Sequence, residues 1–179
     1  MAQSTGWSIL LDKKLTVRQI VLFGMLGALI FAAKYVMAFL PNIEPVSLMV
    51  MLCVVVFGGK AVYPITLYVV MEFLFYGLGL WNINYLYIWA ILAFAAWPMR
   101  QTRSALPWAI LSGTFGLLFG ALCAPVDVVI GGFGYAAAKW VSGIPFDVAH
   151  CIGNFAIALV MFVPMRNLLE KLYAKLERS

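Results

Sequence analysis

Long apolar stretches alternate along the chain with short breaks that contain proline, glycine or charged residues. A helix that crosses a membrane needs about 20 predominantly apolar residues. The pattern therefore predicts an all-α membrane protein, folded as a compact bundle of six transmembrane helices. The six predicted helices cover residues 17–40, 46–57, 61–80, 84–97, 108–130 and 146–163.

Proline and glycine mark the predicted helix ends. Pro41 follows the first apolar stretch, and Gly58 closes the second. The glycine-containing segment 131–135 predicts a flexible loop before the sixth helix. Pro145 suits the first turn of that helix, because a helix start leaves its first N–H groups unpaired and proline has none. Asp147 would then lie near the positive end of the helix dipole.

The overall composition supports a membrane protein. Hydrophobic residues make up 65% of the chain and charged residues 11%, whereas an average soluble domain has about 25% charged residues. Mean hydropathy is +1.00. These values exclude a cytosolic enzyme, a disordered linker and a disulfide-stapled secreted module. We expect a single membrane domain over residues 1–179. Its cytoplasmic N-terminal segment, residues 1–16, lacks the apolar core and cleavage site of a secretory signal.

The distribution of basic residues predicts the orientation in the membrane. Ten of the twelve Lys and Arg residues fall in segments on the side of the two termini, and Lys34 and Lys139 are the exceptions. Cytoplasmic segments of membrane proteins carry an excess of Lys and Arg, so both termini are expected to be cytoplasmic. Residues 165–179 predict an amphipathic cytoplasmic tail on the inner surface of the lipid bilayer. The net charge of +5 forms no single stripe, so nucleic acid is not an expected partner.

Motifs for catalysis and for nucleotide or metal binding are absent from the sequence. There is no HExxH, GxSxG or GxxxxGK[ST] pattern. Cys53, Cys123 and Cys151 form no CxxC pair, and His150 is the single histidine. We therefore expect no catalytic residues, no metal and no cofactor. The energy for any transport would have to come from an ion gradient or from a partner.

Two predicted helices carry small residues at intervals of four. Gly24, Ala28 and Ala32 lie on the first helix. The fifth helix has the same spacing, with Ser112, Gly116 and Gly120. Such stripes let another helix approach closely in a membrane. For the fifth helix we favour packing within the bundle, whereas for the first helix internal packing and docking of a partner stay open.

Several ionisable and amide groups lie within apolar segments. Asp147, His150 and Asn154 share one helix face, because they stand at positions i, i+3 and i+7. Glu72 and Asp127 lie in the third and fifth predicted helices. Ionisable groups in a membrane are costly unless they are paired or hydrated, which suggests a functional cavity. The alternative is a structural network, such as Asp147 with His150 or Lys34 with Glu72.

The connection between the third and fourth helices combines aromatic rings with amides. Aromatic residues at a membrane boundary are commonly interface anchors, which accounts for Trp81 and Tyr85. That reading does not account for Asn82 and Asn84 beside them. Stacking rings with amide hydrogen bonds are typical of a ligand site. The glycine-rich segment 131–135, which includes Tyr135, would form a movable lid over an outward pocket.

These features together resemble the substrate-binding S components of energy-coupling factor (ECF) transporters. The similarity rests on six helices in fewer than 200 residues, the small-residue stripe of the first helix and the basic tail. Three segments are also similar to helix boundaries in that family, namely residues 40–46 (LPNIEPV), 57–59 (FGG) and 143–150 (GIPFDVAH).

The resemblance implies a function as well as a fold. S components capture a vitamin or a metal outside the bacterial cell membrane and deliver it by docking on a membrane scaffold subunit that carries two cytosolic ATPases. Gly24, Ala28 and Ala32 would form the docking surface. The substrate would bind in the outward half of the bundle. The candidate binding residues are Asn42, Glu44, Tyr76, Trp81, Asn82, Asn84, Tyr85, Tyr87, Asp127, Tyr135, Asp147, His150 and Asn154.

The substrate is expected to be a vitamin. The chain lacks the N-terminal histidine segment of nickel and cobalt S components, and it is most similar to the cobalamin type. Pantothenate, folate, riboflavin, thiamine and biotin are the alternatives. We expect His150 to be a hydrogen-bonded core residue rather than a ligand to cobalt. Two other classes stay open, namely a small intramembrane enzyme that uses Glu72, Asp127, Asp147 and His150, and a purely structural subunit.

Overall fold

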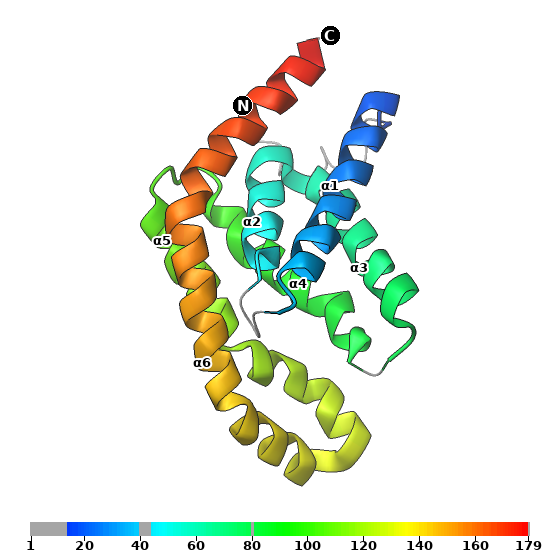
Figure 1. Cartoon of the computed structure of the whole chain (residues 1–179), viewed down its shortest axis with the longest axis vertical. Coiled ribbons are helices and arrows are strands. Elements are labelled where there is room, and N and C mark those ends of the chain that lie inside the picture. The colour runs from blue at the N-terminus through cyan, green and yellow to red at the C-terminus, as the bar shows by residue number, and fades with distance from the viewer. Residues whose placement is uncertain (1–13, 40–43, 80, 179) are drawn as a thin grey trace, which may run out of the picture.

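The computed structural model describes residues 14–39, 44–79 and 81–178 (Figure 1). Every regular element in these ranges is a helix, and they contain no strand. The elements in chain order are α1 (Val17–Val36), α2 (Val46–Phe57), η2 (Gly58–Ala61), α3 (Val62–Tyr76), α4 (Asn82–Ala96), η3 (Trp97–Met99), α5 (Ala105–Leu117) and α6 (Phe119–Arg178). The all-helical fold class is therefore confirmed.

Three helical stretches among the described residues are long and apolar enough to cross a membrane. They are Val17–Val36, Val46–Tyr76 and Ala105–Arg178, and the second and third each contain more than one of the predicted crossings. Their length and composition are compatible with a membrane protein.

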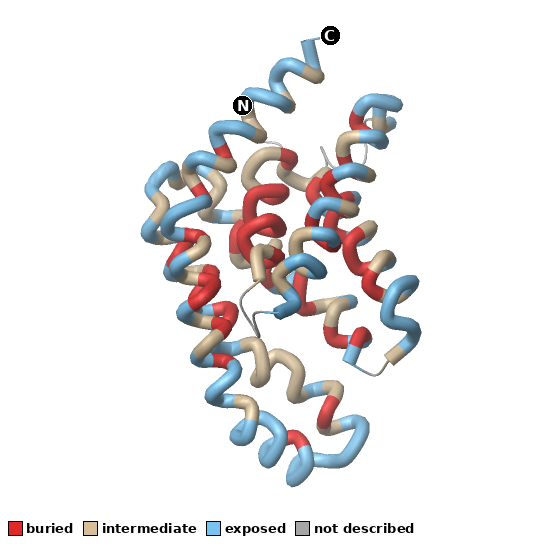
Figure 2. Tube along the Cα trace, in the orientation of Figure 1, coloured by how far each residue is buried: buried red, intermediate tan, exposed pale blue. Residues whose placement is uncertain are grey.

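α2 is the central helix of the bundle. Its sequence VSLMVMLCVVVF is apolar all round, as expected for a helix that other helices surround. Ten of its twelve residues are buried, and Figure 2 shows it as the most continuous buried segment. α1, α3, α4 and α6 all contact it. The predicted range of this helix is confirmed. It ends at Gly58, whose φ of 58° lies in the region that favours glycine.

Glycines set the closest helix contacts. Gly27 of α1 faces α3, and a Cβ atom added there would lie 2.8 Å from Leu67 Cβ. Gly116 of α5 faces α6, and an added Cβ atom would lie 2.8 Å from the His150 carbonyl oxygen. Gly113 lies along the same α5–α6 contact, whereas Gly120 lies in the first turn of α6 and faces Asp147 and Trp140 farther along that element. The predicted role of the Ser112, Gly116 and Gly120 stripe in internal packing is confirmed.

The predicted helix over residues 108–130 is wrong. α5 ends at Leu117 and α6 begins at Phe119, so the apolar stretch is divided between two helices. A side chain distant in sequence stabilises the new helix start, because Asp147 Oδ1 accepts a hydrogen bond of 3.1 Å from the Gly120 N–H. The first N–H groups of a helix have no partner within the helix, so a carboxylate there is favourable.

The predicted loop over residues 131–135 and the predicted helix start near residue 146 are also wrong. Only Gly132 departs from helical geometry, with φ 80° and ψ 177°. The chain reverses there, and residues 119–131 and 133–147 form a helical hairpin that projects from the bundle (Figure 1). The alanine run 136–138 favours helix. Pro145 and Asp147 therefore lie inside α6 rather than at its first turn.

The helix termini gather at two ends of the molecule. The α3–α4 connection and the helical hairpin lie toward one end, which we call the hairpin end (Figure 1). The opposite end, which we call the basic end, holds η2, the connection between α4 and α5, and the C-terminal part of α6. Its basic residues include Lys60, Arg100, Arg103, Arg166 and Lys171.

Candidate functional site

The predicted binding residues fall into two clusters and the helical hairpin. The Lys34 cluster lies between α1, α3 and α4 and contains Lys34, Glu72, Tyr85, Tyr76 and Trp81. The Asn154 cluster lies between α2, α5 and α6 and contains Ser47, Ser112, Asp147, His150 and Asn154. Asn42 lies outside the described residues.

An ion pair forms the centre of the Lys34 cluster. Lys34 Nζ donates to Glu72 Oε2 at 2.8 Å and to the Tyr85 hydroxyl oxygen at 2.9 Å. The Glu72 side chain is fully buried, whereas 16% of the Lys34 side chain is exposed. The sequence-based pairing of Lys34 with Glu72 is confirmed. A buried charge needs such a partner, since an unpaired charge in an apolar interior is costly.

Three aromatic rings surround the Lys34 ammonium group. Its nitrogen lies 4.7 Å from the ring centroid of Tyr85, 5.8 Å from that of Trp81 and 5.9 Å from that of Tyr76. These distances are within the range of cation–π attraction. The aromatic rings of the α3–α4 connection therefore stabilise an internal cation, and they do not act only as membrane-interface anchors.

Glu44 adds a second carboxyl group near this cluster. It lies between α1 and α2, and burial raises its pKa above the ordinary value. Lys34 opposes that shift, and the negative charge of Glu72 adds to it. The carboxyl group of Glu44 beside the cluster is therefore biased toward its neutral form.

Hydrogen bonds of Asn154 join three helices in the second cluster. Asn154 Nδ2 donates to Ser47 Oγ at 3.0 Å and to the Ser112 carbonyl oxygen at 3.4 Å. All three residues are buried. α2, α5 and α6 are therefore held at a fixed separation at this level of the bundle.

Asp147 and His150 are the members of the Asn154 cluster that lie nearest the hairpin on α6, and they do not pair with each other. Asp147 binds the Gly120 N–H, while the His150 ring packs edge-on against Phe119 at a centroid distance of 5.0 Å. His150 is 3% exposed. The Asp147–His150 pairing, which the sequence left open as an alternative to a cavity, is not formed, because the N–H of Gly120 at the start of α6 binds the carboxylate instead.

Trp89 of α4 lies between the two clusters. Its ring is 5.4 Å from Tyr85 on the side of the Lys34 cluster. It is also 5.8 Å from Phe115 and 6.4 Å from Phe119, which contacts His150. A continuous set of aromatic rings therefore connects the clusters. Trp89 was not predicted as a site residue, because an aromatic residue within an apolar helix gives no signal that separates it from the core.

Several buried polar atoms lack a hydrogen-bond partner among the described residues. Buried polar side-chain atoms are normally paired with protein or water. Two of these atoms are the Tyr68 hydroxyl oxygen and Glu72 Oε1, and the hydroxyl and carboxyl groups lie beside each other. The other six are Asn82 Oδ1, Trp89 Nε1, Ser112 Oγ, Asp147 Oδ2, His150 Nε2 and Asn154 Oδ1. All six belong to residues of α4, α5 and α6, and such buried polar atoms can make a contact with water or with a bound molecule.

The two asparagines of the α3–α4 connection already have partners in the protein. Asn82 Nδ2 donates to the Gly77 carbonyl oxygen at 2.7 Å. The Tyr87 hydroxyl lies 2.8 Å from Asn84 Oδ1 and 2.6 Å from the Leu122 carbonyl oxygen, and its single proton can serve one of them. These contacts stabilise the connection and attach it to α6. A role of either amide toward a ligand stays a prediction.

Asp127 and Tyr135 belong to the hairpin rather than to either cluster. Asp127 forms an ion pair of 2.5 Å with Lys139 across the two hairpin arms. The Tyr135 ring lies 5.8 Å from the same Lys139 nitrogen and is 47% exposed. The hairpin is thus a helical element closed by an ion pair, where the sequence suggested a loop.

The small-residue stripe of α1 lies at the edge of the bundle, with Gly24 half-buried like Ala28. A Cβ atom added at Gly24 would meet nothing within 4 Å, and Ala32 is exposed. Ala28 is half-buried. α1 packs on α3 through Gly27 instead. The stripe is therefore not part of the internal α1–α3 contact.

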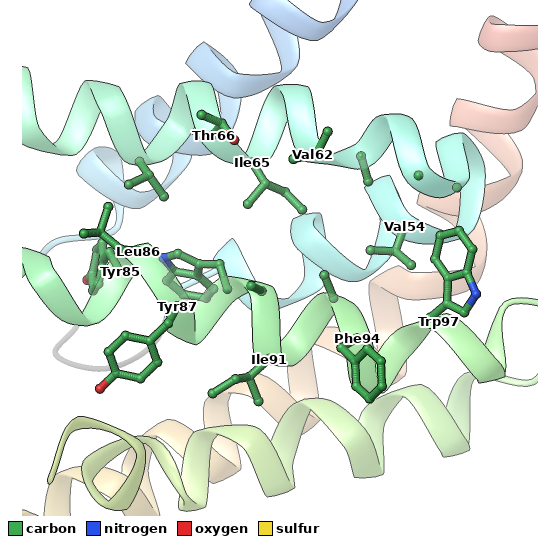
Figure 3. Close-up of a pocket in the computed structure, with 17 residues that line it drawn as sticks. Val54, Val62, Ile65, Thr66, Tyr85, Leu86, Tyr87, Ile91, Phe94 and Trp97 are labelled. Carbon is green, nitrogen blue, oxygen red and sulfur yellow. The ribbon is translucent and has the colours of Figure 1, made fainter. Parts of the chain in front are cut away.

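An apolar groove of about 840 Å³ lies between α3 and α4, and Val54 of α2 contributes to its lining (Figure 3). α3 contributes residues such as Val62, Ile65 and Thr66, and α4 contributes Ile91, Phe94 and Trp97. Tyr85 and Tyr87 are the two predicted site residues that line it. The polar atoms of the Asn154 cluster do not.

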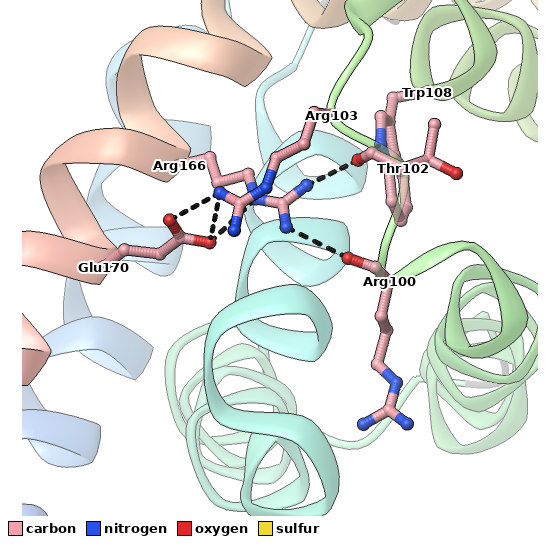
Figure 4. A network of polar contacts seen from close by, with 6 residues as sticks. All are labelled: Arg100, Thr102, Arg103, Trp108, Arg166 and Glu170. Carbon is pink, nitrogen blue, oxygen red and sulfur yellow. Dashed lines mark hydrogen bonds and ion pairs between the residues drawn. The ribbon is translucent and has the colours of Figure 1, made fainter.

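A buried arginine organises the basic end (Figure 4). Arg166 donates to the carbonyl oxygens of Thr102 and Arg100 and to Glu170 Oε1. Glu170 also accepts from Arg103 at 2.7 Å. These contacts attach α6 to the connection between α4 and α5. Residues 166–178 continue α6 directly, and Tyr173 packs edge-on against Phe57.

No group of three or more His, Cys, Asp or Glu side chains suited to a metal ion occurs within residues 14–39, 44–79 and 81–178. The chain matches no protein-family model, no curated protein and no solved structure.

Proposed function

We propose that this chain is the substrate-binding S component of an ECF-type vitamin uptake transporter in a bacterial cell membrane. In this proposal the chain crosses the membrane six times: through α1, α2, α3 and α4, through α5 together with residues 119–131 of α6, and through the part of α6 that follows Gly132. The long apolar helical stretches support the membrane location. The reversal at Gly132 supports counting the parts of α6 before and after it as segments that run in opposite directions.

The observation that carries the proposal is the set of unpaired polar atoms in the Asn154 cluster and on the neighbouring Trp89. Ser112, His150 and Asn154 come from two helices that glycines bring into close contact. Trp89 adds an aromatic face and an unpaired N–H. Apolar rings with a few converging polar groups are the usual composition of a small-molecule site.

The charge distribution supports an outward-facing site. The basic end carries most of the cations, and cytoplasmic segments of membrane proteins are enriched in Lys and Arg. In the proposed orientation the basic end and both termini are cytoplasmic, and the hairpin end is outside. The substrate then enters from the hairpin end.

The exposed stripe of α1 supports docking on a partner. Gly24 and Ala32 offer a surface that a helix could approach closely in a membrane. The proposed partners are the membrane scaffold subunit and, through it, two cytosolic ATPases. The chain itself is not an enzyme in this proposal, and ATP hydrolysis occurs in the partners.

Cobalamin is the proposed substrate, and pantothenate or folate is the alternative. A large amphipathic ligand would use both the rings around Trp89 and the polar atoms of the Asn154 cluster. The geometry does not favour an intramembrane enzyme. Glu72 pairs with Lys34, Asp127 pairs with Lys139, and Asp147 binds the start of α6, so these groups are occupied in different places.

Mass spectrometry of small molecules retained by the purified chain tests this proposal. The full-length protein is purified in detergent, denatured, and the released molecules are compared with those from an unrelated membrane protein purified in parallel. We expect a vitamin in stoichiometric amount and no ATP hydrolysis by the intact chain. Retention of no vitamin by protein from vitamin-supplied cells, or ATPase activity of the pure chain, would contradict the proposal.

A further inference from the structure

The groove between α3 and α4 opens to the outside of the bundle. Residues along it are strongly exposed for apolar side chains, with Val62 at 55%, Leu86 at 63% and Phe94 at 71%. Exposed apolar surface of this kind faces lipid in a membrane protein. With a volume of about 840 Å³, the groove is a hollow in that surface rather than a flat helix face.

A cation lies at one end of the groove. The Arg100 guanidinium carbon is 3.7 Å from the centroid of the Trp97 ring, and a Cβ atom added to Gly58 would lie 3.4 Å from Arg100 Nη1. Trp97 and Gly58 both line the groove, so the guanidinium group lies between two of its lining residues. Figure 4 shows the side chain directed away from Arg166 and Glu170.

No carboxylate neutralises this cation within the described part of the chain. The ion pairs there involve Lys34, Arg103, Lys139 and Arg166, and Arg100 takes part in none of them. Its Nε donates to the Trp97 carbonyl oxygen at 3.1 Å, which fixes the group without cancelling its charge. An arginine presents paired N–H donors that match a phosphate group.

We propose that the groove binds an anionic phospholipid, with an acyl chain along α3 and α4 and the phosphate at Arg100. Charge complementarity selects this ligand. A free phosphate would leave the apolar groove unfilled, and an apolar helix of another protein would bring no anion to Arg100. The site rests on the membrane placement proposed above, under which the basic end lies at the cytoplasmic leaflet, where anionic lipids attract Lys and Arg.

Native mass spectrometry with an equal mixture of phosphatidylglycerol and phosphatidylcholine tests the site on the full-length chain. One cation near an anionic headgroup contributes about 1 kcal/mol, so we expect about fivefold preference for phosphatidylglycerol. Arg100→Gln should reduce the preference to about one. Arg178→Gln removes an exposed cation from the same end of the molecule and should leave the preference unchanged.

A second variant tests the groove without touching the cation. Ala90 is exposed and lines the groove, so Ala90→Phe should fill it and reduce retention of phosphatidylglycerol while Arg100 stays in place. Equal retention of the two lipids by the unmodified chain would overturn the proposal. So would a preference that survives both Arg100→Gln and Ala90→Phe, or one that Arg178→Gln lowers equally. Vitamin retention is measured separately, so failure of the transport proposal is distinguishable from failure of this site.

Discussion

At the scale of single residues, the Asn154 amide has a paired nitrogen and an unpaired oxygen. Both hydrogens of its amide nitrogen are directed to partners on α2 and α5, while its Oδ1 has no partner within the described residues. The hydrogen bonds of the amide nitrogen fix the position of the side chain. The amide oxygen is left as an acceptor for a ligand, and because the side chain is already ordered, binding there would lose little conformational entropy.

We predict that Asn154→Ala weakens vitamin binding several-fold. Loss of one hydrogen bond to the ligand reduces the binding free energy by about 0.5–1.5 kcal/mol. Loss of the contacts to Ser47 and Ser112 lowers the folding stability by a comparable amount. Asn167 lies exposed on the same helix, so Asn167→Ala is the matched control. Titration calorimetry on monodisperse protein measures the effect. Unchanged affinity in the folded Asn154→Ala variant would move the site away from this cluster.

Glu44 predicts a pH dependence of stability. Burial raises its pKa in the folded protein, so the folded state holds the proton more tightly than the unfolded state does. Its contribution to stability is then fully present below the ordinary pKa of 4.5 and is lost as pH rises through the higher folded value. We expect Glu44→Gln to remove this loss, so the difference in melting temperature between variant and parent should grow toward neutral pH. A difference that stays constant from acidic to neutral pH would contradict this assignment.

At the scale of helices, local signals predict the ends of some elements and miss others. α2 ends where the sequence places its end, because Gly58 adopts a positive φ that glycine favours. The division between α5 and α6 has no such signal. It depends on Asp147, which binds the Gly120 N–H from 27 positions along the chain. Contacts between residues so far apart cannot be predicted from hydrophobic periodicity.

In the candidate site too, residues on the same helix could be predicted to lie together, whereas their neighbours on other helices could not. The spacing of Asp147, His150 and Asn154 places them on one helix face, and all three are buried on α6. Ser47 and Ser112 were not predicted as their neighbours, because a small polar residue in an apolar helix carries little information on its own. The ion pair of Lys34 and Glu72 was predictable, because a charged side chain in an apolar segment is costly unless a group of opposite charge pairs with it.

The small residues on two faces of α1 have different surroundings, because Gly27 packs against α3 and Ala32 is exposed. Ala32→Leu adds bulk on the exposed stripe and should block vitamin uptake while leaving binding and folding intact. Gly27→Leu places bulk where an added Cβ atom would already lie 2.8 Å from Leu67, so it should destabilise the bundle. Uptake assays in cells and binding in detergent separate the two effects. Loss of binding in Ala32→Leu would assign the stripe to the bundle instead.

At the scale of the whole molecule, polarity is divided between two ends. The hairpin end carries Asp127 with its partner Lys139, and the basic end carries the Arg166 network and the C-terminal helix. The two clusters and their connecting rings lie in the bundle between these ends. Under the proposed function, the substrate is captured at the hairpin end, and the basic end contacts the cytosolic partners.

Cysteine labelling tests that direction. Cys53 is buried and Cys123 and Cys151 are partly buried, so a variant with all three changed to alanine provides the background. Ser142 is exposed on the hairpin and Ser104 is exposed at the basic end. We expect a membrane-impermeant maleimide to label Ser142→Cys on intact cells and Ser104→Cys only after the cells are opened. Labelling of Ser104→Cys on intact cells would contradict the proposed orientation.

Calorimetric titration of the purified full-length chain with cobalamin, pantothenate and folate tests the central proposal most directly. We predict saturable binding of one of the three, with one site per chain and cobalamin as the first choice. Binding should weaken in Asn154→Ala and persist in Asn167→Ala. A monodisperse, folded chain that binds none of these vitamins, and none of riboflavin, thiamine and biotin, would contradict a vitamin-binding function.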